Sequence, residues 1–298
     1  NDLGGAIDGS GGDQTPAEEV VAEIKAMGGE AVADYANVTD WEGVQGMINL
    51  AVETFGDLHI LINNAGILRD RVIVNMTEAE WDAVIDVHMK GHFVPTRWAT
   101  AYWRERFKET NQPVNARIVY TASEAGLYGN AGQANYSAAK AGIASMAIVV
   151  AREMEKYGVT CNTLNPRART RMTINTFGAD RLTGKEGEFD YNDPDNVSPL
   201  VAFLCSDAAA DVTGQTFVAG GDTVALIGSA DMMHRNLDRR VEALLRLVDP
   251  RHLADLESLM ERGMSDEYAH WKLGGDGRWI RHHLDDEAER GHVAGGSP

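Results

Sequence analysis

The segment at residues 58–66, LHILINNAG, sets the fold class of this chain. Leu58 to Ile62 is a short apolar run with the length and composition of a buried strand. The four residues that follow, NNAG, are polar or small, and small residues let other groups approach the backbone closely. Open α/β sheets bind their ligands where parallel strands end. The segment therefore predicts a buried parallel strand whose carboxyl end carries part of a binding site.

Helical and strand patterns alternate around this segment, from residue 15 to about residue 220. Such alternation predicts a parallel sheet covered by helices. Thr15-Pro16 is a helix start, and Thr77 with Glu80 is a capping-box pattern. The expected helices run from Thr15 to Met27, Thr39 or Asp40 to Phe55, Thr77 to the Trp98 region, Gln133 to Tyr157 and Val197 to Cys205. The expected strands cover 31–36, 58–62, 117–121, 159–163 and 215–219, and the loop 167–195 has the composition of a substrate lid.

The pattern changes after Gly221. Asp231 to Val248 and His252 to Arg262 have the spacing of amphipathic helices. We therefore expect a Rossmann-type domain over 1–228, a helical extension over 229–290 and a disordered tail over 291–298. The extension has three open roles: it covers a dimer interface, caps the substrate pocket or begins another module.

Composition excludes several classes of protein. The formal charge is −18, and no Lys/Arg run supplies the basic face that a nucleic-acid binder needs. No apolar run is long enough to span a membrane. The two cysteines, Cys161 and Cys205, favour a reducing compartment, and His282-His283 has no companion ligands, so we expect a cytoplasmic protein without a metal. The chain begins at Asn1 without a signal peptide, which suggests that the natural N-terminus and any targeting sequence are missing.

Tyr136 and Lys140 are the first candidate catalytic residues. They lie inside a predicted helix at positions i and i+4, so both side chains stand on one face. An ammonium group beside a phenol stabilises the phenolate and lowers its pKa, as a general acid/base for an alcohol requires. Taken alone, the pair also fits an exposed helix face without function.

Ser123 gives the pair its context, because it follows the strand predicted at 117–121 just as NNAG follows the strand at 58–62. A hydroxyl at that position can hydrogen-bond a substrate oxygen. NNAG at 63–66, Ser123, Tyr136 and Lys140, in this order and spacing, resemble the short-chain dehydrogenase/reductase family. The resemblance extends from Asn1 to about Gly221 and implies an enzyme that moves a hydride between a nicotinamide cofactor and an alcohol or ketone.

The resemblance implies a role for each of these residues. Tyr136 exchanges the proton with the substrate, Lys140 lowers the Tyr136 pKa and binds the nicotinamide ribose, and Ser123 orients the substrate oxygen. The family's fourth residue is usually an asparagine that holds a proton-relay water, and His88 stands at that position. Histidine can donate and accept hydrogen bonds, so it can hold the water; the alternative is that it only packs between helices.

The resemblance also implies a cofactor-binding set. Asp2 matches the acid after the second strand, which accepts hydrogen bonds from the adenosine ribose, repels a 2′-phosphate and so favours NAD over NADP. Asn37 stands where the family usually has aspartate, and Arg167 where it usually has glycine. The implied cofactor-binding residues are Asp2, Asn37, Val38, Asn63, Ala65, Gly66, Tyr136, Lys140, Pro166 and Thr170.

A narrower likeness bears on the substrate. NDLGG near the start, NNAGILRDR at 63–71, His88, YGNAGQANYSAAK at 128–140 and CNTLNP…RTRMT at 161–173 are similar to the dehydrogenase unit of type 2 peroxisomal multifunctional β-oxidation enzymes and bacterial relatives. This likeness implies an acyl-CoA substrate, oxidised at a (3R)-hydroxyl with NAD, or a steroid. Arg167, Arg169 and Arg171 could meet a coenzyme A phosphate or could form a solvated loop.

One family element is missing from the sequence. A glycine-rich turn is expected about 20 residues before Asp2, and Gly4-Gly5 and Gly9 to Gly12 do not replace it because no strand leads into them. We therefore expect a doubly wound sheet that lacks its first strand, first helix and most of its second strand. The strand at 31–36 would detach or slide against 58–62, which would otherwise be an uncovered edge. We expect this chain to bind cofactor poorly.

Three functions stay open at this point. The leading one is NAD-dependent dehydrogenation of a 3-hydroxyacyl thioester or another secondary alcohol. The second is NADPH-dependent reduction of a 3-oxoacyl thioester. The third is a catalytically silent relative that binds ligands or serves as an oligomer subunit. The long helices at 77–98 and 133–157 commonly form a dimer face in this family, so we expect a homodimer or homotetramer.

Overall fold

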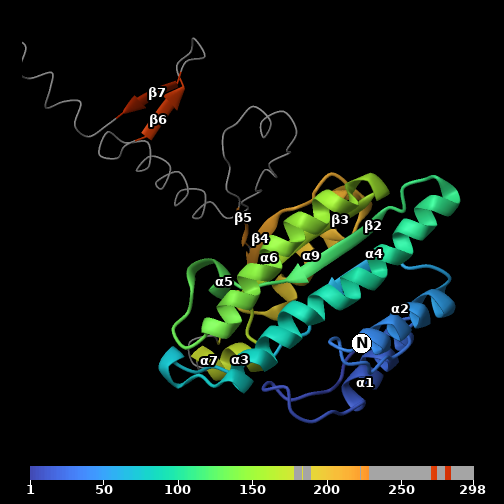
Figure 1. The fold of residues 1–298 in the computed structure, drawn as a ribbon, viewed down its shortest axis with the longest axis horizontal. Coiled ribbons are helices and arrows are strands. Elements are labelled where there is room, and N and C mark those ends of the chain that lie inside the picture. The colour runs from blue at the N-terminus through green and yellow to red at the C-terminus, as the bar shows by residue number, and fades with distance from the viewer. Residues whose placement is uncertain (178–182, 184–188, 222, 228–269, 274–278, 283–298) are drawn as a thin grey trace, which may run out of the picture. The chain divides into compact units, whose positions relative to one another are not determined.

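The computed structural model describes residues 1–177, 183, 189–221, 223–227, 270–273 and 279–282 (Figure 1). The chain divides into two compact units, Asn1–Leu245 and Arg246–Pro298. The first unit holds every residue considered for catalysis, so the account below concerns that unit.

A five-stranded sheet forms the centre of the first unit, in the order β1-β2-β3-β4-β5. Strands β1 (Ile60–Asn63), β2 (Ala116–Thr121), β3 (Val159–Pro166) and β4 (Thr216–Gly220) are parallel, and β5 (Thr223–Ile227) is antiparallel to β4. The prediction of an α/β parallel sheet is confirmed. The last strand predicted from the sequence ended at residue 219, and the structure adds β5, in which Thr223 pairs with Gly220 of β4.

The predicted helices are present, and the structure adds two short helices that were not predicted, α5 (Ala125–Tyr128) and α7 (Arg171–Phe177), the second inside the segment 167–195 that was expected to be a loop. Asp40 caps α2 through the Glu42 amide, and Thr77 and Glu80 form the expected capping box of α3. The predicted helix from Thr77 continues past Trp98 to Thr110, and a π-helical turn, η2, interrupts it. The helices are α1 (Thr15–Ala26), α2 (Trp41–Phe55), α3 (Glu78–Ile85), α4 (Gly91–Thr110), α5 (Ala125–Tyr128), α6 (Ala134–Met154), α7 (Arg171–Phe177) and α9 (Ser198–Leu204), with short turns η1 (Ile73–Asn75), η2 (Asp86–Lys90), η3 (Glu155–Tyr157), η4 (Pro194–Asn196) and η5 (Asp207–Ala209).

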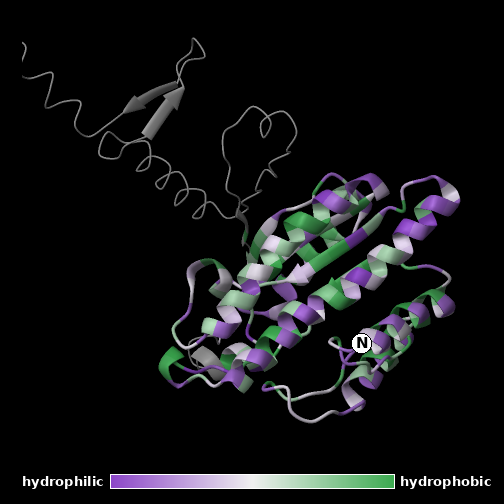
Figure 2. Cartoon of the chain, in the orientation of Figure 1, coloured by the Kyte–Doolittle hydropathy of each residue, from purple (hydrophilic) through white to green (hydrophobic). Residues whose placement is uncertain are grey.

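Helices pack on both faces of the sheet (Figure 1). On one face, α4 and α6 bury a core that includes Trp103, Ile118 and Ile143. On the other face, α9 buries a smaller core around Leu204 and Phe217. Figure 2 shows hydrophobic residues concentrated in the central strands and hydrophilic residues along much of α4. Burial of these apolar side chains is the main force that holds the layers together.

Strand β1 forms one edge of the sheet, as predicted. Its side chains alternate, with Leu61 buried towards α4 and Ile60 and Ile62 exposed at 42% and 47%. The strand predicted at 31–36 is absent, and that segment is irregular. The Asp2 amide donates to the Asp34 carbonyl, but no ladder forms there. A strand needs a neighbour along its length, and neither β1 nor residues 1–2 provide one.

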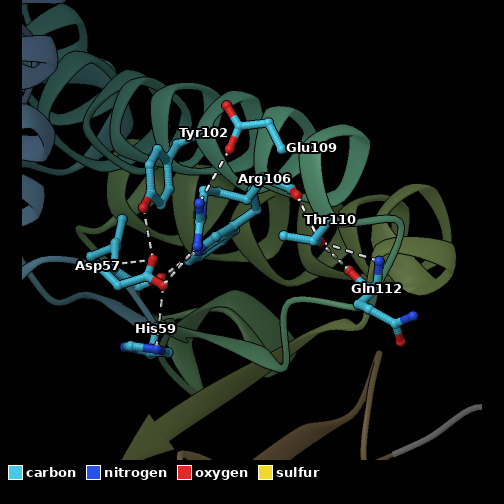
Figure 3. A network of polar contacts seen from close by, with 9 residues as sticks. Asp57, His59, Tyr102, Arg106, Glu109, Thr110 and Gln112 are labelled. Atoms are coloured by element: carbon cyan, nitrogen blue, oxygen red, sulfur yellow. Dashed lines mark hydrogen bonds and ion pairs between the residues drawn. The ribbon is translucent and has the colours of Figure 1, made fainter.

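A polar network anchors the edge strand at the end opposite to its carboxyl terminus (Figure 3). Asp57, in the turn before β1, accepts hydrogen bonds of 2.8 Å from the Tyr102 hydroxyl and 2.8 Å from the Leu58 amide. His59 and Arg106 lie 3.7 and 3.8 Å from its second oxygen. The carboxylate therefore ties the turn before β1 to α4.

Some predictions for the C-terminal region lie outside the described residues, namely the helices at 231–248 and 252–262 and the tail at 291–298. Two strands are described within the range assigned to a helical extension. They are β6 (His270–Leu273) and β7 (Trp279–His282), which pair antiparallel.

Candidate active site

The carboxyl ends of β1, β2 and β3 meet at one edge of the sheet because these strands are parallel. Asn63 ends β1, Ser123 lies two residues beyond β2, and Pro166 ends β3. A cavity of about 390 Å³ opens at this edge and is mostly apolar. Ser123, Tyr136 and Pro166 line it. The strand-end placement inferred from the sequence therefore brings two of the candidate catalytic residues to one cavity.

Tyr136 and Lys140 stand one turn apart on α6. The Lys140 Nζ atom lies 5.4 Å from the centre of the Tyr136 ring and donates a hydrogen bond of 2.5 Å to the Thr121 carbonyl at the end of β2. Lys140 is 3% exposed, so the ammonium is held in a fixed position. The structure thus places Ser123, Tyr136 and Lys140 together.

The electrostatics of the pair differ from the sequence expectation. Burial raises the pKa of Tyr136 above 10, and the Asp70 charge raises it further, while a hydrogen bond with Ser123 opposes both effects. Burial also lowers the pKa of Lys140 to about 7. Lys140 was expected to lower the Tyr136 pKa, but its ammonium is desolvated and donates to Thr121, so burial decides the direction for both groups.

His88 lies in the π-helical turn η2, with its ring 5.1 Å from the Tyr136 ring in an edge-to-face contact. Its Nε2 atom is within hydrogen-bond distance of the carbonyl and amide of Ile67, at 2.9 and 3.2 Å. The Nδ1 atom is buried without a partner. Burial, followed by the Lys140 charge, holds the pKa of His88 well below 6.5, so the ring is neutral. A neutral imidazole with one unpaired nitrogen can hold a water. Both interpretations of His88 therefore stay open, that it holds a proton-relay water and that it only packs between helices.

Gly66 makes the His88 position sterically available. A Cβ atom on Gly66 would lie 2.5 Å from the His88 Cε1 atom. The glycine of NNAG is therefore needed here for close approach to an imidazole.

Sequence reasoning missed a second buried histidine, His92, one turn further along the helix. It is 0% exposed, its ring contacts Tyr120 edge to face, and burial followed by the Lys140 charge lowers its pKa to about 3. Backbone groups of His88, Asn63 and Thr121 surround the ring, but no partner meets hydrogen-bond geometry at either nitrogen. The spacing of four residues from His88 was the available signal.

The arginines after β3 already have carboxylate partners in two cases. Arg167 makes two hydrogen bonds of 2.6 Å to Glu124, and Arg169 lies 2.6 Å from Asp190. Arg171 begins α7 and is exposed. Residue spacing does not indicate these partners, because Glu124 is far from Arg167 along the chain and Asp190 is far from Arg169.

The comparisons with known proteins agree with this geometry. The family model described as short chain dehydrogenase matches residues 9–179. The chain belongs to this family.

The relatives of this dehydrogenase include enzymes whose names specify an acyl thioester as the substrate. A hydroxyacyl-CoA dehydrogenase of Mycobacterium tuberculosis is 44% identical over 79% of this chain and 73% of its own length. A peroxisomal multifunctional enzyme type 2 of Drosophila melanogaster is 44% identical over 71% of this chain and 32% of its length. A 3-oxoacyl-[acyl-carrier-protein] reductase of Synechocystis is 40% identical over 70% of this chain and 83% of its length.

A solved structure supports the fold of the dehydrogenase. The crystal structure of a short chain dehydrogenase from Mycobacterium avium has a TM-score of 0.66 and 46% identity, and the alignment covers 87% of this chain and 83% of that one. The predicted resemblance, including the narrower likeness to type 2 multifunctional enzymes, is confirmed.

A second family model overlaps the end of the dehydrogenase. The model described as polyphosphate kinase C-terminal domain 2 matches residues 215–292. The match begins at the strands β4 and β5 of the sheet and covers about a quarter of the chain. The sequence interpretation assigned no family to this region.

The predicted cofactor residues of the dehydrogenase divide into two groups. Asn63, Tyr136, Lys140 and Pro166 lie at the edge where β1 to β3 end, with Ala65 and Gly66 in the loop after β1. In contrast, the Asp2 carboxylate accepts from the Gly4 amide, and the Asn37 side chain accepts from Thr39, so both serve local turns. The last two residues of this second group also make local contacts: Val38 packs against Gly91, and the Thr170 hydroxyl accepts a hydrogen bond from the Thr173 amide.

The first group fits one half of a nicotinamide dinucleotide. Lys140 and Tyr136 provide hydrogen-bonding groups for a ribose at the sheet edge, and the buried Asn165 Oδ1 and His88 Nδ1 atoms there have no partner. The described residues contain no glycine-rich turn between a strand and a helix to cradle the phosphates. The site therefore fits the nicotinamide ribose better than the pyrophosphate. Within the described residues, no helix is both long and apolar enough to cross a membrane.

Proposed function

We propose that this dehydrogenase oxidises the hydroxyl at C3 of an acyl thioester with NAD. One observation carries the proposal: Ser123 and Tyr136 line one mostly apolar cavity, with Lys140 buried beside Tyr136. The apolar lining suits an acyl chain, and the two hydroxyls suit the single oxygen at the reacting carbon. The relative named hydroxyacyl-CoA dehydrogenase supports the substrate class.

Each of the three residues has a defined task. Ser123 donates a hydrogen bond to the substrate oxygen and fixes its orientation. Tyr136 accepts the hydroxyl proton during oxidation and returns it during reduction. Lys140, fixed by the Thr121 carbonyl, places a positive charge beside the phenol when protonated and provides hydrogen bonds for a ribose. NAD, when bound, supplies the acceptor for the hydride. The residues proposed to hold it are those gathered where β1 to β3 end, namely Asn63, Ala65, Gly66, Tyr136, Lys140 and Pro166.

The Tyr136 pKa sets the direction of pH dependence. Since the pKa lies above 10, the residue is a neutral phenol at pH 7 and can donate a proton to a ketone. Oxidation requires the phenolate, so its rate is expected to rise with pH through the alkaline range. Reduction is expected to fall over the same range.

The runner-up is reduction of a 3-oxoacyl thioester with NADPH, favoured by the relative named 3-oxoacyl-[acyl-carrier-protein] reductase. The same residues perform this reaction in reverse. A steroid alcohol is a further substrate, because the apolar cavity does not demand a thioester. The third reading, a silent binding or oligomer subunit, is opposed by the assembled Ser123, Tyr136 and Lys140.

A substrate and cofactor panel tests the proposal. The protein is assayed by absorbance at 340 nm with 3-hydroxyacyl thioesters and a steroid alcohol, each with NAD and with NADP, and with 3-oxoacyl thioesters and NADPH. Millimolar NAD is used because the phosphate cradle is incomplete among the described residues. The proposal expects the highest kcat/KM with a 3-hydroxyacyl thioester and NAD. Preference for NADPH reduction would favour the runner-up, and no turnover in any arm would favour the silent reading.

The proposal also includes a homodimer or homotetramer and a cytoplasmic location. Light scattering on the purified protein tests the first statement, and fractionation of the source cells tests the second. A monomer, or recovery in another compartment, would contradict the respective statement.

A further inference from the structure

The ion pair between Glu124 and Arg167 lies in the wall of the cavity. Both residues line it, Glu124 next to Ser123 after β2 and Arg167 next to Pro166 after β3. The guanidinium donates two hydrogen bonds of 2.6 Å, one to each carboxylate oxygen. This is the bidentate geometry in which arginine also binds a substrate carboxylate or phosphate.

The remaining lining residues of this cavity are uncharged. The charge of the cavity wall therefore comes from Glu124 and Arg167, and their opposite charges cancel. The hydrogen bonds with Glu124 raise the pKa of Arg167, so the guanidinium stays charged. An entering anion would have to displace a carboxylate already in place and leave Glu124 unpaired.

We propose that Glu124 is a specificity-determining residue that occupies Arg167 and so restricts the cavity to substrates without a negative charge on the acyl chain. This inference rests on the proposed function, since it concerns the chain of the thioester in the same site. It differs from the interpretation that these arginines bind an anionic substrate, because the Glu124 carboxylate already neutralises the Arg167 charge.

Two variants that break the same ion pair are expected to act in opposite directions. In Glu124→Gln, Arg167 becomes free, and an acidic chain gains a charge-assisted partner. In Arg167→Gln, Glu124 remains as an unpaired negative charge and repels an acidic chain. A purely structural role of the pair would change both variants in the same direction.

The experiment measures equilibrium binding by calorimetry, without NAD, so that it does not depend on turnover. The probes are the pantetheine thioesters of 3-hydroxyhexanoic acid and of 3-hydroxyadipic acid, which differ in the charge at the end of the chain and carry no phosphate. The neutral thioester is expected to bind the unaltered protein more tightly, with a ratio of Kd values on the order of tenfold or more.

Glu124→Gln is expected to shift that ratio towards the acidic thioester on the order of tenfold, and Arg167→Gln to shift it the other way. Equal ratios in all three proteins, a preference of the unaltered protein for the acidic thioester, or no binding of either probe would overturn the inference. If one variant fails to fold, the sign of the shift in the other decides. Binding in the expected order without NADH formation would leave this inference standing and reject the proposed oxidation.

Discussion

Replacing Asp57 with alanine is expected to destabilise the first unit by about 3 kcal/mol. The carboxylate accepts two hydrogen bonds of 2.8 Å, from Tyr102 and from the Leu58 amide. Hydrogen bonds to charged groups contribute about 1.5–3 kcal/mol each, and the Asp57 side chain is 33% exposed, so the lower end applies. The contacts with His59 and Arg106 at 3.7 and 3.8 Å add little, about 0–1 kcal/mol.

The assay is urea unfolding followed by circular dichroism at several pH values. Burial acts to raise the Asp57 pKa, but the hydrogen bonds from Tyr102 and Leu58 outweigh it, so the pKa is lowered. A lowered pKa contributes stability that is present above the unfolded pKa of about 3.9 and is lost as the pH falls through the folded pKa. The charge-dependent part of the difference should therefore be complete at pH 7 and vanish in acid.

Two further variants complete the design. Asp57→Asn keeps an acceptor for Tyr102 but removes the charge, so it is expected to cost about 1 kcal/mol. Glu105→Ala is the matched control, since its contacts with Arg104 and Lys108 are exposed and contribute little to stability. A loss for Asp57→Ala no larger than that for Glu105→Ala would refute the reasoning.

The remaining predictions concern the site and the sheet edge. His88→Asn is expected to retain most of the turnover, because asparagine can also hold a water, whereas His88→Leu should lose about tenfold or more in kcat; equal kcat values for the two variants would reject the relay reading. In the folded protein, burial lowers the pKa of Lys140 from 10.5 to about 7. Between pH 7 and pH 10 the unfolded wild type therefore binds more protons than the folded one, and the stability of the fold should increase as the pH rises. Lys140→Met should lack this gain in a series of thermal melts, and parallel pH profiles would contradict the assignment. Ile62→Lys should reduce aggregation in light scattering with a stability change of about 0.5 kcal/mol or less, since Ile62 is 47% exposed on an edge strand; unchanged aggregation would show that this edge is not its source.

Sequence reasoning brought the proposed catalytic residues together because their positions follow from local rules. The helical spacing of Tyr136 and Lys140 and the strand-end position of Ser123 require only a parallel sheet, and the structure supplies it. The capping box at Thr77 was likewise readable from neighbouring residues, and of the two helix starts expected at Thr39 or Asp40 the structure has the cap at Asp40.

The misses depended on partners far away in the chain. The segment 31–36 has strand composition, and its detachment was one of the two expected outcomes, but composition could not show that the detached segment loses its strand conformation. Glu124 as the partner of Arg167 follows from the adjacency of β2 and β3, not from spacing. The raised pKa of Tyr136 follows from burial, and no pattern of residue types measures how deeply a phenol is covered.

The two groups of cofactor residues illustrate the same limit. Asn63 and Pro166 sit at strand ends, so the sheet places them at the site. Asp2 and Asn37 were assigned through the family resemblance alone, and their side chains serve local turns in this structure.

The most direct test of the central claim is NADH formation from a 3-hydroxyacyl thioester at millimolar NAD, compared between the wild type and Tyr136→Phe. The substitution removes one hydroxyl and keeps the ring that contacts His88. The account predicts that the variant binds the thioester with an unchanged Kd and loses at least about a thousandfold in kcat, at the middle of the range for general acid/base catalysis. Comparable turnover in the two proteins would contradict the assignment of Tyr136 as the acid/base and, with it, the proposed mechanism.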